Sequence, residues 1–368
     1  MFKNLHLWLG SYLFQETVRS FRFGKPKGPV HIMFCFVDHF EPDWNKADEA
    51  TQLERVKRWV KEYPLLAQKH RDADGRQPRH TFFYPAEVYN SQHLDLLAEL
   101  VNAGYGEIEV HLHHDKDTEE GLKAKLEKAK QDFGRHGFLG KRPLSDTMRF
   151  AFIHGNWALN NSRPDGCWCG VNDESRILSE AGCYADFTYP SAPSPTQTAK
   201  INSIYYTSSN PRKPKSHNQG NNVYKGGATK GDLMVIQGPL ALNFKQRKFG
   251  LLPRIENGDI TGANPPNAGR VDLWVRQAIC VEDKPEWIFV KVHTHGAPEK
   301  NAGTLLGALC DGMYSYLESR YNDGRRFFLH YVTAREMYNI IKAAEAGETG
   351  NPGNYRDYMI EKNHLLTV

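Results

Sequence analysis

The stretch VHIMFCFV, residues 30–37, is an unbroken apolar run that ends directly on Asp38 and His39. A run of this length, rich in β-branched and aromatic residues, is typical of a strand that is buried on both faces of a parallel sheet. Seven further short runs have the same character and are also predicted as strands. They are residues 81–84, 107–112, 149–153, 185–189, 232–236, 287–292 and 327–329.

Amphipathic helical patterns lie between many of these runs. They cover residues 51–61, 91–103, 118–133, 172–181, 303–319 and 333–346, and Ser91 is the predicted N-cap of the second of them. Strands that alternate with helices indicate βα units and a mainly parallel sheet. The sequence therefore predicts an α/β fold, and more narrowly a (β/α) barrel with long loop insertions.

The chain divides into three parts on this interpretation. Residues 29–347 are predicted to form a single barrel domain, since barrels often exceed ~250 residues. Within it, residues 191–270 are rich in Asn, Gly, Pro and Lys and are expected to be an insertion that forms a lid or binding wall. Residues 1–28 are an amphipathic N-terminal segment, and residues 348–368 are a C-terminal tail.

Composition excludes several classes of protein. The 368 residues include 47 Lys+Arg and 43 Asp+Glu, a balance that argues against a nucleic-acid binder with a basic stripe. There is neither a secretory-signal pattern nor a run of ~18 apolar residues, so no transmembrane segment is expected. The apolar residues 5–14 fit either a helix on a membrane surface or a helix packed under the barrel.

Six scattered cysteines predict reduced thiols rather than a disulfide framework. Cys167 and Cys169 resemble half of a zinc clip, but no second pair completes it. Together with the missing signal, these cysteines predict a cytoplasmic protein, with peripheral membrane contact through the N-terminus as the remaining option.

Histidines gather directly after the predicted strands. They follow five of the eight, although the whole chain has 16 histidines. Those at the strand ends are His39, His111, His113, His114, His154, His293, His295 and His330. Because the carboxyl ends of barrel strands open on one face, where active sites lie, the sequence predicts a histidine-rich active site there.

The three expected metal ligands follow the first and third predicted strands. An Asp-His pair such as Asp38 and His39 can supply a base and a metal ligand. Strand alternation puts His111 and His113 on one side, and Asp117 follows across a turn. His113, Asp117 and either Asp38 or His39 make three protein ligands and leave one position for water, which is typical of a catalytic metal.

The pair His293 and His295 follows a late strand. One of them can act as a general acid on a leaving amine, and the other then hydrogen-bonds at the rim. Spacing alone leaves the choice open.

The order of these motifs resembles the polysaccharide deacetylase family, the NodB-homology group of carbohydrate esterases, and in particular its WbmS-like branch. The matching segments are FVDH (36–39), EVHLHHDKD (109–117), FIHGNW (152–157), DFTYP (186–190) and VKVH (290–293). The resemblance implies a distorted seven- or eight-stranded barrel and a carbohydrate substrate. It also implies a metal-dependent hydrolase that removes an N-acetyl group from an amino sugar or polysaccharide precursor.

The resemblance also assigns roles. Asp38 stands where the family has its catalytic base, and His293 where it has its catalytic acid. His113 matches the first metal histidine. His39 stands where a metal-binding Asp is usual, and Asp117 where the second metal histidine is usual, so two ligands are changed in type. The expected metal is Zn²⁺, with Co, Ni, Mn or Fe as alternatives, because each replacement can still bind such metals.

Further residues are candidates for the outer shell of the metal or for substrate contact. They are His111, His114, His154, Asn156, Trp157, Asp186, Tyr84 and His295. A backbone N–H near Asn156 and Trp157 is expected to help stabilise an oxyanion. Trp157, Tyr84 and Tyr189 offer flat faces for a sugar ring.

Two other classes of protein remain as alternatives. Asp38, Glu41 and Asp186 could be the carboxylates of a glycoside hydrolase, although such an enzyme has no need of clustered histidines. A catalytically degenerate glycan-binding barrel would account for the changed ligands.

Overall fold

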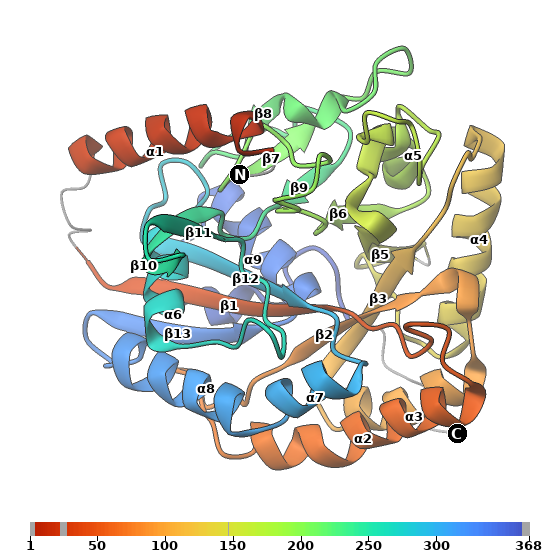
Figure 1. Ribbon diagram of the computed structural model, residues 1–368, viewed down its shortest axis with the longest axis horizontal. Coiled ribbons are helices and arrows are strands. Elements are labelled where there is room, and N and C mark those ends of the chain that lie inside the picture. Colours follow the sequence, from red (N-terminus) through yellow and green to blue (C-terminus); the bar gives the residue numbers. More distant parts are fainter. Residues whose placement is uncertain (1–3, 23–27, 146, 363–368) are drawn as a thin grey trace.

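The computed structural model describes residues 4–22, 28–145 and 147–362, which form an α/β fold around one large, mostly parallel sheet (Figure 1). The main path of the sheet is β12 (Trp287–Thr294), β1 (Val30–His39), β2 (His80–Pro85), β3 (Gly106–Leu112), β5 (Met148–His154), β6 (Cys183–Asp186), β9 (Met234–Ile236), β7 (Ile204–Thr207) and β8 (Gly220–Asn222). In addition, β13 (Phe327–Val332) pairs with β1 and β4 (Gly140–Lys141) with β5, while β10 (Ala241–Lys248) and β11 (Leu252–Glu256) form a hairpin.

Each of the eight runs predicted as strands overlaps a strand of this sheet, which confirms the α/β prediction. The unbroken apolar run of residues 30–37 is explained by the place of β1. This strand pairs with β12 along one edge, and with β13 and then β2 along the other. Nearly all of its residues are buried, so both faces must be apolar.

Helices cover the sheet. They are α1 (Leu9–Arg22), α2 (Glu49–Ala67), α3 (Ser91–Asn102), α4 (Glu119–Arg135), α5 (Glu174–Glu180), α6 (Ala268–Arg276), α7 (Glu299–Leu305), α8 (Ala308–Tyr321) and α9 (Ala334–Ala346). The N-cap of α3 is Asn90 rather than Ser91, since the Asn90 side chain accepts the His93 amide. The predicted helix over residues 303–319 is two helices, α7 and α8.

No closed barrel is found in the described residues, because the hydrogen-bonded sheet is open. The reason lies in β9, which pairs with β6 on one edge and with antiparallel β7 on the other. Closure into a barrel would require β9 to pair with β12. Strand β7, from the region predicted as an insertion, occupies that edge of β9 instead. The two parts are instead bridged by a side chain: the Lys291 ammonium of β12 donates to the carbonyl oxygens of Phe187 and Tyr189.

Residues 191–270 are more ordered than their composition suggests. They contribute β7, β8 and β9 to the sheet and the hairpin of β10 and β11. The sequence indicated one strand here. Strands β8 and β11 lack an apolar run, β10 is mostly polar, and β7 is apolar but only four residues long, so none of the four shows the longer apolar run that predicts a buried strand.

Helix α1 packs on this region (Figure 1). Trp8 and Tyr12 are buried against Ile201 and Leu240, whereas Phe14 is 69% exposed. One face of residues 5–14 is thus packed against the fold and the other is open. Among the described residues, no helix has both the length and the apolar character needed to cross a membrane.

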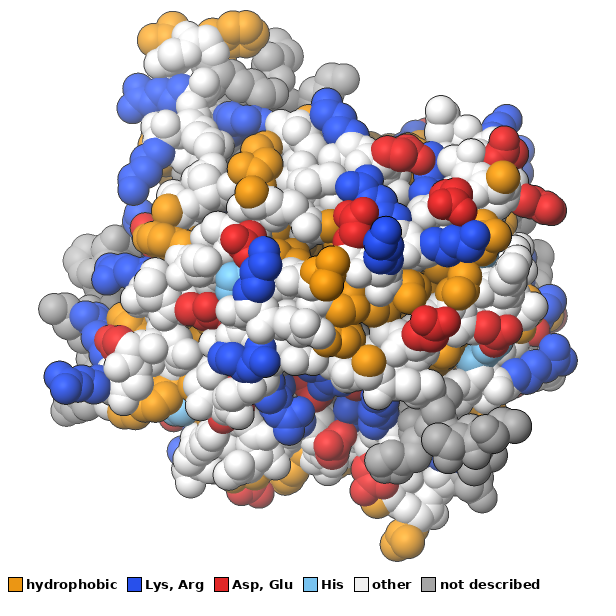
Figure 2. Space-filling model, turned by 90° about the horizontal axis from the view of Figure 1, so that it is seen from below, with side chains coloured by type: hydrophobic (Ala, Val, Ile, Leu, Met, Phe, Trp, Pro, Cys, Tyr) orange, Lys and Arg blue, Asp and Glu red, His pale blue; other side chains and the backbone are white. Residues whose placement is uncertain are grey.

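Figure 2 shows the face of the molecule that carries α2, α7 and α8. Lys and Arg side chains are interspersed there with Asp and Glu, around a central group of hydrophobic side chains. Neither sign of charge dominates this face.

The described part of the C-terminal segment is pinned by a buried charge network. Arg356 donates to Glu336, Asp72 and Asp74, and Glu336 also pairs with Arg79. Burial would raise the pKa of Glu336, but Arg79 and Arg356 outweigh burial and lower that pKa to about 2. Glu336 also closes the capping box at the start of α9.

We predict that Glu336→Gln lowers the free energy of unfolding by about 3 kcal/mol at pH 7, because Arg356 and Arg79 each lose one of their anionic partners in a largely buried network. The folded pKa of Glu336 is depressed, so its contribution is complete above the unfolded pKa of about 4.5 and fades as the pH falls towards 2. Urea unfolding of both proteins at pH 7, 5 and 4 should show the difference narrowing. Glu54→Gln, which removes an exposed ion pair with Lys57, should cost less than about 1 kcal/mol. A difference that stays constant with pH would contradict the argument.

Candidate metal centre

Five side chains meet at the carboxyl ends of β1, β3 and β12, and we call them the histidine cluster. They are His39, Glu41, His111, His113 and His295. Their possible ligand atoms fall into two groups, His39 with Glu41 and His295, and Glu41 with His111 and His113, each spanning no more than 4.8 Å. Glu41 belongs to both groups and is the centre of the cluster.

Strand β1 delivers the first two members. His39 is its last residue, and Glu41 follows two positions later; both are buried. The His39 ring stacks on His295 at 4.6 Å and meets the edge of His111 at 4.9 Å, between ring centres. Burial and the neighbouring histidines hold the pKa of His39 well below its usual value, so this imidazole is neutral and keeps a lone pair.

His111 has a hydrogen-bond acceptor at each ring nitrogen. Nδ1 lies 2.9 Å from the carbonyl oxygen of Ile153, and Nε2 lies 3.0 Å from Glu41 Oε1. The carbonyl can only accept, so Nδ1 carries the proton and Nε2 of a neutral ring has its lone pair towards the carboxylate. A cation between Nε2 and Oε1 satisfies both atoms.

His113 repeats this pattern. Nδ1 lies 2.5 Å from Glu87 Oε1, and Nε2 lies 3.4 Å from the same Glu41 Oε1. Burial would lower the pKa of His113, but the hydrogen bonds to Glu41 and Glu87 raise it to about 10. A cation at Nε2 replaces the second proton, while Glu87 fixes the tautomer in the manner of carboxylate–histidine–metal triads.

Strand β12 delivers His293 and His295, two residues apart, and both lie near His39. His295 belongs to the histidine cluster. The His293 ring lies 6.4 Å from that of His39, and its buried Nδ1 has no hydrogen-bond partner. Burial lowers the pKa of both histidines.

Asp38 lies beside the cluster but its oxygens are occupied. Oδ2 lies 2.9 Å from His80 Nε2, and Oδ1 accepts the Gly296 amide at 2.6 Å. Asp38 is 0% exposed, and a Cβ on Gly296 would lie 2.1 Å from Oδ2. These contacts are those of an anchor that joins β1 to β2 and to the loop after β12, rather than those of a base or a ligand with a free oxygen.

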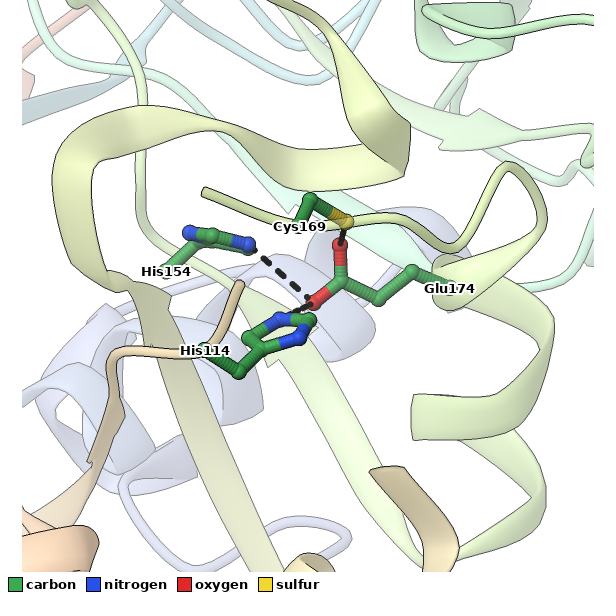
Figure 3. A group of neighbouring side chains, drawn as sticks. All are labelled: His114, His154, Cys169 and Glu174. Atoms are coloured by element: carbon green, nitrogen blue, oxygen red, sulfur yellow. Dashed lines mark hydrogen bonds and ion pairs between the residues drawn. The ribbon is translucent and has the colours of Figure 1, made fainter. Parts of the chain in front are cut away.

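Asp117, predicted as a ligand, lies apart from the histidine cluster. Its Oδ2 pairs with Lys125 at 2.6 Å and lies 3.2 Å from His114 Nδ1. The turn after β3 separates neighbours: His113 faces the histidine cluster, whereas His114 faces a second group with His154 (Figure 3). Spacing along the chain could not reveal this divergence, because it depends on the path of the turn.

The predicted sugar-binding aromatics divide in the same way. Trp157 lies 5.9 Å from His39 and 5.8 Å from His295, between ring centres, and is partly exposed. Tyr84 and Tyr189 are fully buried. The Tyr84 hydroxyl lies next to His93, and the Tyr189 hydroxyl next to the Trp157 carbonyl.

Asp186 is also buried, and both of its oxygens accept from Thr188. Asn156, like Trp157, has a positive φ, 57° and 58°, which places this turn under backbone strain.

Three residues of the site had no metal or substrate role in the sequence prediction. The sequence predicts Glu41 only as a glycosidase carboxylate, and it predicts no role for Glu87 or Trp44. Glu87 follows β2 by two residues, so the same rule about strand ends could have found it. Trp44 lies 5.1 Å from His295 and is 45% exposed, and its role depends on a loop that only the structure places.

No protein-family model matches the chain, and no curated protein matches it either. The interpretation of the site therefore depends on its own geometry. Buried groups of His, Glu and Cys that could hold a metal ion are present in the described residues.

We predict that His113→Ala lowers bound metal by one equivalent per chain, because the imidazole that faces both Glu41 and Glu87 is lost. Elemental analysis after dialysis against Zn²⁺ measures this. His136→Ala removes a histidine that contacts Tyr89 and Asp95 outside the cluster and should leave the metal content unchanged. Equal metal in the two variants would rule out the cluster as a metal site.

Proposed function

We propose that the chain is a metal-dependent hydrolase that removes an N-acyl group from an amino sugar or a polysaccharide precursor. The observation that carries the proposal is the pair His111 and His113, each with acceptors at both nitrogens and both facing one oxygen of Glu41. Such an arrangement at the carboxyl ends of parallel strands favours a catalytic cation. The sugar substrate and the deacetylase-type barrel, here opened by β7, are supported by the order of the sequence motifs.

The proposed ligands come from the histidine cluster: Glu41 with His111 and His113 in one group, and the same Glu41 with His39 and His295 in the other. Imidazole and carboxylate ligands suit Zn²⁺ first, and Co, Ni, Mn or Fe as alternatives. When bound, such a metal polarises an acyl carbonyl and makes water acidic enough to attack it near neutral pH.

The surrounding residues perform the remaining tasks in this proposal. Trp157 and the exposed Trp44 flank His295 and offer flat apolar faces to a sugar ring. His293 lies near His39 and passes a proton to the departing amine; because burial keeps its resting imidazole neutral, it first takes that proton from the attacking water. Asp38 positions the loop that carries His295.

The glycoside hydrolase alternative receives little support. It requires two carboxylates that face a common cavity. Both oxygens of Asp38 and both of Asp186 are engaged by buried neighbours. A degenerate glycan-binding protein would not need a metal, so the metal content of purified protein tests that alternative. A cytoplasmic location, with Phe14 of α1 as a membrane contact, remains part of the proposal.

We predict that His293→Ala lowers turnover by ~10²–10⁴ and keeps its metal, since a proton donor is not a ligand. His295→Ala should instead lose metal affinity, because His295 belongs to the histidine cluster. Acetate release from an N-acetylated chito-oligosaccharide, measured together with bound metal, separates the two effects. Metal loss in His293→Ala, or full turnover in it, would require the roles to be exchanged or abandoned.

We also predict that Asp38→Asn keeps turnover within about tenfold of wild type at saturating metal, because an amide oxygen still accepts the Gly296 amide. A general base at this position would lose ~10²–10⁴ on the same change. Gly296→Ala should be the more damaging variant, since its Cβ displaces the Asp38 carboxylate. A loss of 10² or more in Asp38→Asn, with the fold intact by circular dichroism, would restore Asp38 as the base.

A further inference from the structure

A second group of ligand-type side chains lies next to the histidine cluster, and we call it the buried quartet. Its members are His114 from the turn after β3, His154 at the end of β5, Cys169 from the following loop, and Glu174 at the start of α5. The four side chains are 0% exposed. Figure 3 shows them converging from separate elements around the Glu174 carboxylate.

The two histidines of the buried quartet repeat the pattern of acceptors at both nitrogens. His114 has Asp117 Oδ2 3.2 Å from Nδ1, without good hydrogen-bond geometry, and Glu174 Oε1 3.1 Å from Nε2. Nδ1 of His154 has two neighbours: the Gly155 carbonyl oxygen, which accepts and is the closer, and the Ala158 amide, which donates to it at 3.3 Å. Its buried Nε2 lies 3.5 Å from the same Glu174 oxygen and has no hydrogen-bond partner. Both Nε2 atoms therefore face a carboxylate oxygen that one cation could share with them.

Cys169 sits in surroundings suited to a thiolate ligand. The amides of Asn161 and Val171 point at Sγ, at 3.3 and 3.4 Å, and Glu174 Oε2 lies 3.4 Å away. Burial and the Glu174 charge raise the pKa of the Cys169 thiol, so without a cation the sulfur keeps its proton. The two amide donors stabilise negative charge on sulfur once that proton is gone.

We propose that the buried quartet is a closed, structural Zn²⁺ site with ligands from His114, His154, Cys169 and Glu174. On binding, a Zn–S bond forms at Cys169, the thiol proton goes to water, and two neutral imidazoles and one carboxylate complete the shell. One thiolate and one carboxylate neutralise the ion, which removes the cost of a buried net charge. The thiolate and imidazoles favour Zn²⁺ over hard cations such as Mg²⁺ and Ca²⁺.

The distances fit this assignment. Ligand atoms around a tetrahedral zinc are about 3.4 Å apart, given bonds of ~2.1 Å. The two Nε2 atoms lie 3.1 and 3.5 Å from Glu174 Oε1, close to this value. Sγ lies 3.4 Å from the other oxygen, Oε2, and the ligand atoms of the four residues all lie within 4.8 Å of one another. Four protein ligands leave no position for water, which distinguishes this site from a catalytic one.

The proposed zinc fixes one wall of the histidine cluster. His114 directly follows His113 in the chain, and a Cβ on Gly155 would lie 2.3 Å from the His113 ring. The turn after His154 also carries Trp157 in a strained conformation with positive φ. A metal crosslink between His114, His154 and the loop of Cys169 would hold these neighbours in place.

The test uses Co²⁺ in place of Zn²⁺ on the full-length chain. Thiolate bound to Co²⁺ gives a charge-transfer absorption band in the near ultraviolet, which the sulfur-free histidine cluster cannot produce. We expect the band in wild type and its loss in Cys169→Ser. Cys167→Ser, two residues away and partly exposed, should retain it. Cys169→Ser should also weaken Zn²⁺ binding by more than the ~10–100-fold that loss of an outer-shell partner costs.

The same measurement separates this site from the proposed active site. His113→Ala should lose metal from the histidine cluster but keep the Co²⁺–thiolate band. Cys169→Ser should lose the band but keep the metal of the cluster. If Cys169→Ser does not fold, the band in wild type and in Cys167→Ser decides, since the other described cysteines belong to no metal-sized group. Absence of the band from wild type, or its survival in Cys169→Ser, overturns the proposal.

Discussion

The carboxylate of Asp38 is the interaction on which the geometry of the site depends. It accepts from His80, the first residue of β2, and from the Gly296 amide, so it ties β1 to the start of β2 and to the loop after β12. The hydrogen bond between Asp38 and Gly296 sets the positions of His39 and His295, because His39 directly follows Asp38 in the sequence and His295 directly precedes Gly296. A buried carboxylate is tolerated only when its oxygens are satisfied, and the absence of a Cβ at Gly296 allows the close approach.

Two groups of ligands follow from the same local device. In each, a histidine presents Nδ1 to an acceptor and Nε2 to a glutamate shared with a second histidine. Holding one nitrogen fixes the tautomer and leaves the other lone pair directed at the carboxylate. The turn after β3 sends His113 to one group and His114 to the other, so a single short segment serves both.

The sequence predicted the strands and the edge of the sheet at which ligands gather, because apolar runs and strand ends are local signals. His39 and His293 lie near each other, with ring centres 6.4 Å apart, and His39 and His113 each belong to a group that contains Glu41. Spacing could not reveal that Asp117 lies apart, since it cannot tell which way a turn faces, and Asp117 pairs with Lys125 instead. The open edge of the sheet depends on β7, a strand of only four residues whose antiparallel pairing with β9 has no local sequence signal. Of the partners of Cys169, Glu174 is close in sequence, but His114 follows β3 and His154 ends β5.

The two groups differ in access, and access decides what each can do. The histidine cluster has partly exposed members, His113 and His295, and exposed Trp44 beside it, so a substrate can reach it. The buried quartet has no exposed side chain and a soft sulfur ligand, which suits a cation that never exchanges its ligands. Because Gly155 packs directly on His113, a rigid quartet limits how far that ligand can move. A catalytic metal needs such fixed ligands, since displacements of about 1 Å can cost ~10²-fold in rate.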